Sequence, residues 1–421
     1  MKIFFSAGEP SGDLHGANLI RALCKRCPQL EAVGYGGPEM AQAGCQLHSD
    51  LTALAVMWFL RALLNLHKFL ALAGRADRYF RHHKPDAVVL VDFPGFNWWI
   101  ARRAKAHGIP VFYYAPPQIW AWASWRVKKM RRFVDHVLCA LRFEQQWLAE
   151  RGCHAVFVGH PFFDEVRRQA LDERFVRDHT DPSRPLVALL PGSRTQEVVA
   201  NLKYFIAAAG RIGAQVPSAR FAVASFKPHQ AALAREAISQ SGLPIEVFVR
   251  RTPELIHLAH CCLAVSGSVS LELLYHMKPT AILYWISPLA FAVQRRFRRV
   301  RYITLVNLLA AKEVFSKAKF PIAEADNRDP DVLFPEYLTC EDKSEQLAEH
   351  AVEWLTNDKA RQELISRLAR LKAEVAHGGA SSRAADYIMA ELARLTPAVP
   401  RPHFNPALAA AREPWVHSTA A

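Results

Sequence analysis

The sequence predicts an α/β protein made of two successive, doubly wound domains that face each other across a cleft. Short apolar runs rich in Val, Ile, Leu and Phe alternate with helical patterns, which is typical of a parallel sheet covered on both faces. The alternation begins again near residue 185, and a chain of 421 residues is long enough for two such domains. Ligands of such sheets bind at the carboxyl ends of the strands, so the predicted site is the interdomain cleft.

The first half contains predicted strands separated by helical patterns, notably over 18–27 and 64–83. After the last strand, Gly159-His160-Pro161 interrupts regular structure and predicts an interdomain hinge. We therefore place the first domain at residues 1–165. Its predicted strands are Lys2–Ser6, Ala87–Asp92, Val111–Tyr114 and His136–Leu141.

The second half repeats this organisation and forms a predicted domain over residues 166–342. Residues 343–395 are helical and rich in charge. Residues 396–421 contain prolines and alanines with little periodicity, which predicts a disordered tail. The predicted strands of the second domain are Pro185–Leu190, Arg220–Ala224, Ile245–Val249, Leu263–Val265 and Thr280–Tyr284.

Positively charged residues outnumber negatively charged ones in the sequence. The formal net charge is +14, and two basic clusters lie at 126–132 and 295–301. Such clusters attract nucleic acid, anionic lipid or phosphorylated substrates, and a solvated basic face is the alternative. No recognised nucleic-acid-binding motif accompanies the charge, so we expect no nucleic-acid partner.

The most hydrophobic stretch, Leu51–Leu72, is interrupted by polar residues such as Arg61 and Lys68, which disfavours a membrane span. It either lies on a bilayer with its apolar face down or forms a buried core helix. Together with the basic clusters, it favours binding to an anionic membrane surface. The eight cysteines are scattered, which favours a reducing, cytoplasmic location.

Two stretches of the second half combine a strand end with residues suited to an anion. In Pro191-Gly192-Ser193-Arg194, a glycine turns the chain into a helix whose free N–H groups bind anions, and Arg194 adds bidentate donors. Ser266-Gly267-Ser268 follows the end of the predicted strand Leu263–Val265. Glu272, a turn later, is placed to accept hydrogen bonds from a ribose. Ordinary strand-to-helix turns are the alternative. The predicted diphosphate-binding residues are Ser193, Arg194, Ser266, Gly267, Ser268 and Glu272.

Carboxylates follow two strands of the first half. The loop after the first strand contains Glu9 and Asp13, whose charges repel a diphosphate but accept hydrogen bonds from sugar hydroxyls. Asp92 ends the strand AVVLVD in an aromatic setting, which predicts a raised pKa and a catalytic role, with a helix cap as the alternative. We therefore expect an acceptor or sugar pocket here.

A segment rich in aromatic residues, 114–122, follows these carboxylates further along the chain. Trp120 and Trp122 are placed to stack on sugars or hold acyl chains, with core packing as the alternative. The sequence has no Walker lysine motif and no G-x-G-x-x-G with a suitably spaced acid, and Asp92-Phe93-Pro94 is not an Asp-x-Asp pair. We therefore expect neither a cofactor nor a metal ion.

Taken together, these stretches resemble lipid-A-disaccharide synthases, the bacterial glycosyltransferases that join two acylated glucosamines. The shared motifs occur in the same order along the chain. They are GEPSGD (8–13), GYGGPEM (34–40), LAVM (54–57), DFPGFN (92–97), PPQIWAW (116–122), RFE (142–144), GHP (159–161), LLPGSRTQEV (189–198), SGSVSLE (266–272) and NLLA (307–310).

The resemblance implies a GT-B fold of two Rossmann-like domains at the cytoplasmic face of the inner membrane. It implies transfer of 2,3-diacylglucosamine from its UDP form to 2,3-diacylglucosamine 1-phosphate (lipid X), with inversion at the anomeric carbon and release of UDP. It also implies a homodimer in which the C-terminal helices, 343–395, pack on the first domain or on a partner subunit.

By this resemblance Asp92 is the candidate base, and Glu9 and Asp13 shape the sugar pocket. Asn307 lies near the donor, in addition to the diphosphate-binding residues given above. Inversion requires a base for the acceptor 6-hydroxyl and positive groups for the departing UDP. The implied contacts to acyl chains and membrane come from Met57, Trp58, Trp120 and Trp122.

The chain departs from the family pattern after LAVM. Where the family usually has a glycine and, three residues on, a glutamate, this sequence has Trp58 and Arg61. Two rival hypotheses therefore accompany the transferase: another UDP-sugar enzyme on the same scaffold, such as a UDP-N-acetylglucosamine 2-epimerase, and a membrane-binding relative that has lost turnover.

Overall fold

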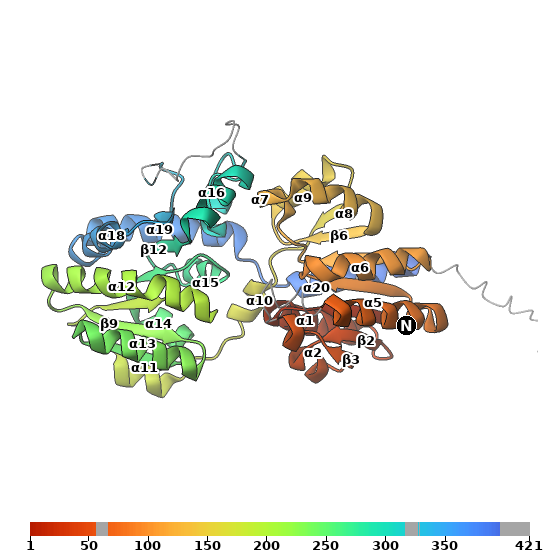
Figure 1. The fold of residues 1–421 in the computed structure, drawn as a ribbon, viewed down its shortest axis with the longest axis horizontal. Helices are drawn as coiled ribbons and strands as arrows, with labels where there is room; N and C mark the ends of the chain where they lie inside the picture. Colours follow the sequence, from red (N-terminus) through yellow and green to blue (C-terminus); the bar gives the residue numbers. More distant parts are fainter. Residues whose placement is uncertain (56–65, 316–326, 328, 396–421) are drawn as a thin grey trace, which may run out of the picture.

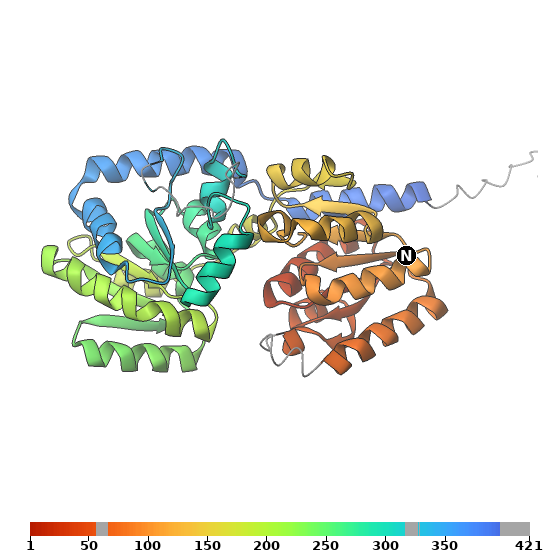
Figure 2. The ribbon, with the colours of Figure 1, turned by 45° about the horizontal axis from the view of Figure 1, so that its top comes forward.

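Two parallel sheets, each covered by helices on both faces, form the two lobes seen in Figure 1. The computed structural model describes residues 1–55, 66–315, 327 and 329–395. The predicted tail, the segment around Met57 and Trp58, and Arg61 lie outside the described residues. Figure 2 shows the two lobes from a second direction, with helices on either side of each sheet.

The first lobe contains a seven-stranded sheet in the described part of the chain, in the order β3-β2-β1-β4-β5-β6-β7. All its strand pairs are parallel, and β1 and β4 are the neighbours at which the strand order reverses. The strands are β1 (Lys2–Ala7), β2 (Glu31–Gly36), β3 (Gln46–Asp50), β4 (Ala87–Val91), β5 (Val111–Tyr114), β6 (His136–Cys139) and β7 (Ala155–Phe157).

Helices connect these strands and bury their apolar faces on the sheet. The helices are α1 (Pro10–Arg26), α2 (Pro38–Gln42), α3 (Thr52–Ala55), α5 (Leu66–His83), α6 (Pro94–Ala106), α7 (Ile119–Trp122), α8 (Val127–Phe133), α9 (Arg142–Ala149) and α10 (Phe162–Val166). One short 3₁₀ helix, Ser124–Arg126, joins α7 to α8.

Helix α1 corrects one sequence prediction. We expected Asp13 to lie in a loop that precedes a helix over 18–27, but the helix begins at Pro10. Proline suits the first turn because its fixed φ is helical and it lacks an N–H group that would go unpaired there. Glu9 is therefore the residue that immediately precedes the helix, and Asp13 lies in its first turn.

The second lobe contains a six-stranded parallel sheet in the described residues, in the order β10-β9-β8-β11-β12-β13. The strand order reverses between β8 and β11, as it does between β1 and β4. The strands are β8 (Leu186–Leu190), β9 (Arg220–Ser225), β10 (Ile245–Val249), β11 (Ala259–Ala264), β12 (Thr280–Trp285) and β13 (Glu336–Thr339). The helices are α11 (Glu173–His179), α12 (Thr195–Gln215), α13 (Pro228–Ser241), α14 (Thr252–Leu258), α15 (Val269–Tyr275), α16 (Pro288–Phe297) and α17 (Leu305–Ala310).

The C-terminal helices divide between the lobes. Helices α18 (Ser344–Thr356) and α19 (Asp358–Val375) bury Leu347 and Leu368 in the core of the second lobe. Helix α20 (Ala380–Leu395) crosses back, as Figure 1 shows, and buries Ile388 in the core of the first lobe. The Asp164 carboxylate holds this crossing, because it accepts hydrogen bonds from the backbone N–H groups of Gly379 and Ser381. The chain thus passes between the lobes at two places that are bonded to each other.

A segment of the second lobe also packs on the first. Val300, Tyr302 and Leu308 belong to the same buried cluster as first-lobe residues of β4 and β5. All eight cysteines lie in the described residues, and none forms a disulfide. None of the helices in the described ranges is both long and apolar enough to cross a membrane.

Candidate active site

The first half of the site lies where β1 and β4 end. Ala7 pairs with Val91 in the sheet, so Glu9 and Asp92 follow neighbouring strand ends. The approach is close: a Cβ atom on Gly8 would lie 2.3 Å from the ring of Phe93, so glycine is required there. Two of the predicted catalytic carboxylates therefore meet at the switch point of the first sheet, where ligands of such folds bind.

The backbone at Asp92 is strained and is held by side chains. Asp92 and Phe93 have φ angles of +43° and +45°, a left-handed conformation that is uncommon for residues other than glycine. The Asp92 carbonyl accepts hydrogen bonds from Asn97 Nδ2 and Tyr113 Oη, both at 2.7 Å. Asn97 is itself fixed, because its Oδ1 accepts a hydrogen bond from Ser6 Oγ at 2.7 Å. Strain of this kind, fixed by surrounding bonds, is typical of functional positions.

The Asp92 carboxyl has the electrostatics of a base that works near neutral pH. Burial raises its pKa to about 6, and the negative charge of Glu9 adds to this rise. The Phe93 N–H group, His15 and Arg194 act in the opposite direction. A carboxyl with this pKa is largely ionised at pH 7, yet it binds a proton more readily than an ordinary aspartate.

The second half of the site lies where β8 and β11 end. Leu190 pairs with Ala264, so the loops that carry Arg194 and Ser266 are neighbours. Gly192 has a φ of +120°, which allows the turn. Gln230, fully buried, donates a 2.9 Å hydrogen bond from its side-chain amide to the Ser193 carbonyl and fixes the loop.

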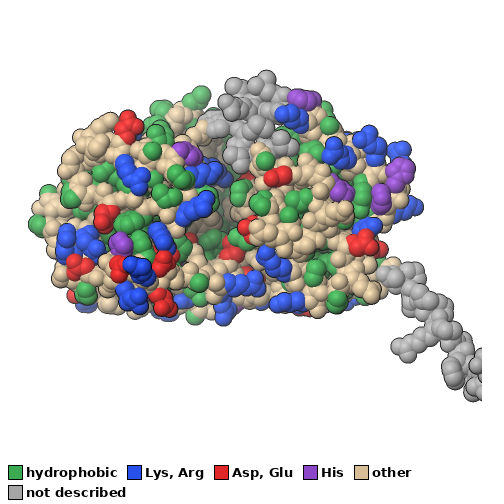
Figure 3. Space-filling view, turned by 90° about the horizontal axis from the view of Figure 1, so that it is seen from below, with side chains coloured by type: hydrophobic (Ala, Val, Ile, Leu, Met, Phe, Trp, Pro, Cys, Tyr) green, Lys and Arg blue, Asp and Glu red, His purple; other side chains and the backbone are tan. Residues whose placement is uncertain are grey.

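Arg194 links the two halves of the site. Its guanidinium lies 3.0 Å from Glu197 Oε1 and 3.7 Å from Glu9 Oε2 of the other lobe. Its side chain is largely exposed to the cleft, and so is the neighbouring Ser193. Figure 3 shows a hollow between the lobes, with Lys and Arg side chains gathered along its edge. The structure therefore places a predicted diphosphate-binding cation next to a predicted sugar-binding carboxylate.

The Ser266 loop faces a cavity shared by both lobes. Ser266 Oγ donates a 3.0 Å hydrogen bond to the Ile303 carbonyl, while Gly267 and Ser268 are exposed. The cavity has a volume of about 740 Å³, within the ~300–1,000 Å³ range of small-molecule sites. Predicted residues from both lobes line it, namely Arg194, Ser266, Trp120 and Trp122.

Glu272 lies deeper, at the junction of α15 with α10. Only 8% of the residue is exposed, and burial raises the pKa of its carboxyl to about 7. Its Oε1 atom is buried and has no hydrogen-bond partner within the described residues. Gln169 hydrogen-bonds this carboxyl and opposes the rise in its pKa, while Oε1 stays available to a donor of a bound ligand.

Asp13 has a structural role in the first lobe. It is 2% exposed, and its carboxylate accepts hydrogen bonds from the backbone N–H groups of Gly37, Glu39 and Met40 at 2.7–3.1 Å. These N–H groups belong to the first turn of α2, which has no intrahelical partner for them. Asp13 therefore caps α2, and its two carboxylate oxygens are engaged by these N–H groups.

Asn307 has a structural role that the sequence did not predict. It is fully buried, its Oδ1 accepts from the N–H groups of Leu333 and Phe334 at 3.0 Å, and its Nδ2 donates to the Phe334 carbonyl and to Glu336. Its side-chain amide is thus fully engaged inside the second lobe. Glu336 also accepts from the N–H groups of Ile303 and Thr304, so this pair orders the turn against which Ser266 rests.

We expect Asn307→Ala to destabilise the second lobe far more than it weakens UDP binding. It leaves several buried groups unpaired, which lowers the free energy of unfolding by about 3 kcal/mol and the melting temperature by about 5–10 °C. Thermal unfolding and UDP titration at low temperature measure the two effects. A variant that melts like the wild type but fails to bind UDP would contradict this assignment.

The two described tryptophans of the predicted acceptor set differ in role. Trp120 is buried and donates a 2.9 Å hydrogen bond from Nε1 to Glu144, so it is part of the core although one face lines the cavity. Trp122 is 48% exposed and stacks under Arg126 at 4.9 Å. The other two members of that set, Met57 and Trp58, lie outside the described residues.

Several residues that organise the site were missed from the sequence. Asn97, Glu144, Gln230 and Glu336 act through buried hydrogen bonds to backbone or to other side chains, which no spacing rule reveals. The only available signal was the position of Asn97 and Glu144 inside recognised motifs. In the described ranges, no group of three or more His, Cys, Asp or Glu side chains is arranged to hold a metal ion.

Known structures share this architecture. The UDP-GlcNAc 2-epimerase from Neisseria meningitidis, bound to UDP-GlcNAc, superposes with a TM-score of 0.61 at 11% sequence identity, covering 93% of this chain and all of that one. The calicheamicin glycosyltransferase CalG4 superposes with a TM-score of 0.54 at 16% identity, covering 94% of this chain and 99% of that one. At such identities the likeness shows the fold alone.

Two doubly wound domains whose strand ends face a common cleft define the GT-B class of glycosyltransferase fold. The family model for lipid-A-disaccharide synthetase matches residues 3–377. The chain therefore belongs to the lipid-A-disaccharide synthase family, and it is a glycosyltransferase of lipid A biosynthesis.

Individual relatives agree with this family. The lipid-A-disaccharide synthase of Coxiella burnetii (strain CbuG_Q212) is 32% identical over 391 residues, covering 92% of this chain and 97% of that protein. The one from Myxococcus xanthus (strain DK1622) is 32% identical over 394 residues, with the same coverage. The one from Alkalilimnicola ehrlichii is 35% identical over 333 residues, covering 78% of this chain and 87% of that protein. The family predicted from the sequence motifs is confirmed.

Proposed function

We propose that this chain transfers 2,3-diacylglucosamine from UDP-2,3-diacylglucosamine to the 6-hydroxyl of lipid X, giving the β-1′,6-linked disaccharide 1-phosphate and UDP. One observation supports this assignment of residues. Asp92, a carboxylate of raised pKa, lies at the strand ends of the first lobe, and Arg194 lies at the strand ends of the second lobe. The two lobes meet where Arg194 lies 3.7 Å from Glu9. Inverting glycosyl transfer needs both groups.

In the proposed reaction, Asp92 acts on the acceptor. The acceptor 6-oxygen forms a bond to the anomeric carbon of the donor while the bond from that carbon to the UDP oxygen breaks. The hydroxyl proton passes to the Asp92 carboxylate, and the bonding electron pair leaves with UDP. The raised pKa of Asp92 supports this role because it makes the carboxylate a stronger base.

The leaving diphosphate is bound by the second lobe. Arg194 supplies a delocalised charge with paired donors, and the exposed hydroxyls of Ser193 and Ser268 lie on the adjacent loops. Gly267 keeps its loop open, and Ser266 anchors it to the Ile303 carbonyl. Positive charge that meets the developing negative charge of UDP lowers the barrier to its departure.

Two further carboxylates complete the donor site. The unpaired Oε1 of Glu272 supports contact with the ribose hydroxyls of UDP, which would satisfy a buried acceptor. Glu9, at 3.7 Å from Arg194, orients that guanidinium and accepts hydrogen bonds from the donor sugar.

We also propose that the protein binds the inner membrane from its cytoplasmic side. Exposed apolar side chains occur on both lobes, including Leu66 and Leu70 on α5 and Leu289 and Phe297 on α16. The basic clusters at 126–132 and 295–301 lie in the sequence beside several of them, and apolar side chains combined with basic residues suit an anionic lipid surface.

We expect the protein to float with vesicles that contain phosphatidylglycerol and to be released as salt rises, because screening shortens the Debye length to ~3 Å at 1 M salt. Charge reversal at the exposed Lys129 and Arg132 should reduce flotation, whereas the same change at Arg174 and Arg235 should not. Equal flotation with neutral vesicles would contradict an anionic lipid partner. The homodimer stays a prediction, which sedimentation tests.

The decisive assay measures UDP release from UDP-2,3-diacylglucosamine with and without lipid X. Release that requires lipid X and yields a disaccharide phosphate supports the transferase. Release or epimerisation without lipid X would instead favour another UDP-sugar enzyme. Folded protein that binds UDP but never turns over would favour the inactive relative, and the first reversion to test is then Arg61→Glu.

A further inference from the structure

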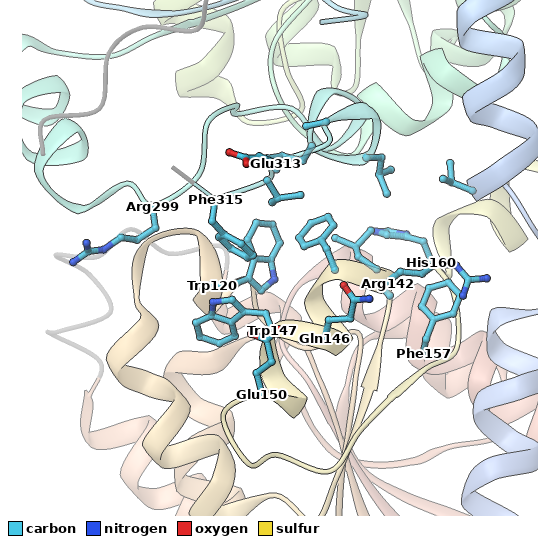
Figure 4. Close-up of a pocket in the computed structure, with 18 of the residues that line it drawn as sticks. Trp120, Arg142, Gln146, Trp147, Glu150, Phe157, His160, Arg299, Glu313 and Phe315 are labelled. Carbon is cyan, nitrogen blue, oxygen red and sulfur yellow. The ribbon is translucent and has the colours of Figure 1, made fainter. Parts of the chain in front are cut away.

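A second, larger cavity is lined by residues of both lobes and shares Trp120 with the cavity that Arg194 lines. Its volume is about 1450 Å³, above the ~300–1,000 Å³ typical of small-molecule sites. Figure 4 shows side chains from both lobes lining it. Residues of five of the shared motifs that the proposed reaction leaves without a role meet here, namely Trp120, Arg142, Phe143, His160, Leu271, Leu308 and Leu309.

One wall of the cavity is an aromatic cluster that joins the lobes. The ring of Phe315, from the second lobe, lies 6.5 Å from Trp120, 6.3 Å from Phe143 and 6.4 Å from Trp147, measured between centroids. Figure 4 shows Phe315 between the tryptophans and the residues above them. Leu309 adds aliphatic surface to the wall. Such a wall buries hydrocarbon, which a soluble sugar phosphate would not require.

A cation without a counter-charge lies on this cavity. The Arg142 guanidinium stacks on the Phe157 ring at 4.5 Å, and no carboxylate among the described residues pairs with it. Arg151 stacks in the same way on Trp147 at 4.1 Å, but Glu150 partly neutralises it at 3.3 Å. Stacking pre-positions a guanidinium while leaving its donor edge available to phosphate. Lys128 and Lys312 also line the cavity, but Arg142 combines a stacked guanidinium with the absence of an ion pair among the described residues, so it is the group that we select for an anion.

The cavity lies beside the donor site. Trp120, Trp125 and Leu308 line both this cavity and the 740 Å³ cavity that contains Arg194 and Ser266. The proposed reaction already assigns the diphosphate to the Arg194 loop. The remaining phosphate of the reaction is the 1-phosphate of the acceptor, whose two acyl chains need an apolar wall. An anionic, doubly acylated sugar matches the apolar wall and the unpaired cation together.

We propose that the cavity of Figure 4 is the acceptor site, in which the acyl chains of lipid X lie against the Phe315 cluster and its phosphate binds Arg142. This inference rests on the proposed function. Arg142 is a binding residue and takes no part in proton transfer.

Steady-state kinetics with two acceptors test the phosphate contact. We expect Arg142→Ala to raise the KM for lipid X by about 10-fold or more, because a charge-assisted hydrogen bond to phosphate is lost. The KM for the donor and the Kd for UDP should stay within twofold. The same variant should leave the KM for diacylglucosamine lacking the phosphate unchanged, and Arg142→Lys should restore part of the loss. Arg103→Ala is the matched control, because Arg103 stacks on Trp99 at 5.7 Å, lies outside both basic clusters and does not line the cavity.

A second variant tests the acyl wall. Gln146 is exposed on α9 and lines the cavity, so Gln146→Trp adds bulk there without disturbing the core. We expect it to lower kcat/KM for long-chain acceptors and to spare short-chain ones, whereas Ala149→Trp on the same helix should have little effect.

The possible outcomes distinguish failure of the acceptor site from failure of the proposed function. If the wild type forms no disaccharide from lipid X, the proposed function fails. If it does, and Arg142→Ala behaves like Arg103→Ala or impairs both acceptors equally, the acceptor site is refuted and the proposed function stands. If Arg142→Ala reduces binding to phosphatidylglycerol vesicles and leaves the KM for detergent-dispersed lipid X unchanged, the cavity holds a bulk membrane lipid and the acceptor assignment is likewise refuted.

Discussion

Replacing Asp92 by asparagine is expected to lower kcat by about 10²–10⁴-fold, the usual contribution of a general base. The variant should keep its fold, because asparagine tolerates the left-handed backbone at this position better than most residues. The bonds from Asn97 and Tyr113 reach the main-chain carbonyl, so they do not depend on the carboxylate. Steady-state kinetics and UDP titration should show a loss of kcat with little change in the Kd for UDP.

The pH profile gives an independent check of the same assignment. Since burial and Glu9 raise the pKa of Asp92 to about 6, the rate of the wild type should fall as pH decreases through that value and the base becomes protonated. The residual rate of Asp92→Asn should lack this acid limb. The control is Asp77→Asn, because Asp77 pairs with Arg81 on the same helix, α5, and with His107, the residue that follows α6. An Asp92→Asn variant with near-normal turnover would remove Asp92 as the base.

The regular part of the fold was predictable because its strands are strongly apolar. Three observed strands coincide with predicted apolar runs to within one residue, namely Ala87–Val91, Val111–Tyr114 and Ile245–Val249. Apolar strands of this kind are easily recognised in a sequence. The strands Glu31–Gly36 and Gln46–Asp50 were missed. The first contains two glycines, and the second is a polar edge strand, so neither shows the apolar run on which the prediction depended.

In the candidate site, the residues at strand ends were predicted correctly to face the cleft, whereas other polar motif residues turn inward. A residue that ends a buried strand is placed by the strand, so Asp92, Glu9 and Arg194 were predicted to face one cleft, and the structure brings them together. Asp13 and Asn307 were also polar residues in motifs, yet their side chains turn inward to backbone groups of α2 and of residues 333–334. Motif membership alone does not distinguish a group that contacts a ligand from one that holds the loop beside it.

The arrangement of the site suggests why so many motif residues are structural. Each lobe contributes only a few groups at its strand ends, and each of these groups is fixed from behind. Asn97 fixes Asp92, Gln230 fixes the Ser193 loop, and Glu336 fixes the turn beneath Ser266. Transfer between two bound lipids needs the base and the leaving-group cation at a constant separation, and fixed loops on rigid sheets provide it.

Replacing Arg194 by alanine is the second change expected to have a large effect. Removal of one cationic donor from a developing anion lowers kcat by about 10²–10³-fold, and here the Kd for UDP should rise as well, because the same group binds the diphosphate in the ground state. Arg194→Lys should recover only part of the loss, since an ammonium lacks the paired, planar donors.

Replacing Arg194 should also change the pH profile of the reaction. Its charge is one of the groups that lower the pKa of Asp92, so the acid limb of the residual activity of Arg194→Ala should move to higher pH. The control is Arg174→Ala, because Arg174 pairs only loosely with Asp178, at 3.7 Å, on the surface of α11. A variant that lost UDP binding without any shift of the acid limb would show that the two lobes do not approach as closely in the working enzyme as the 3.7 Å contact between Arg194 and Glu9 implies. A shift in the expected direction, with a lower kcat, would tie the base of one lobe to the cation of the other within a single catalytic centre.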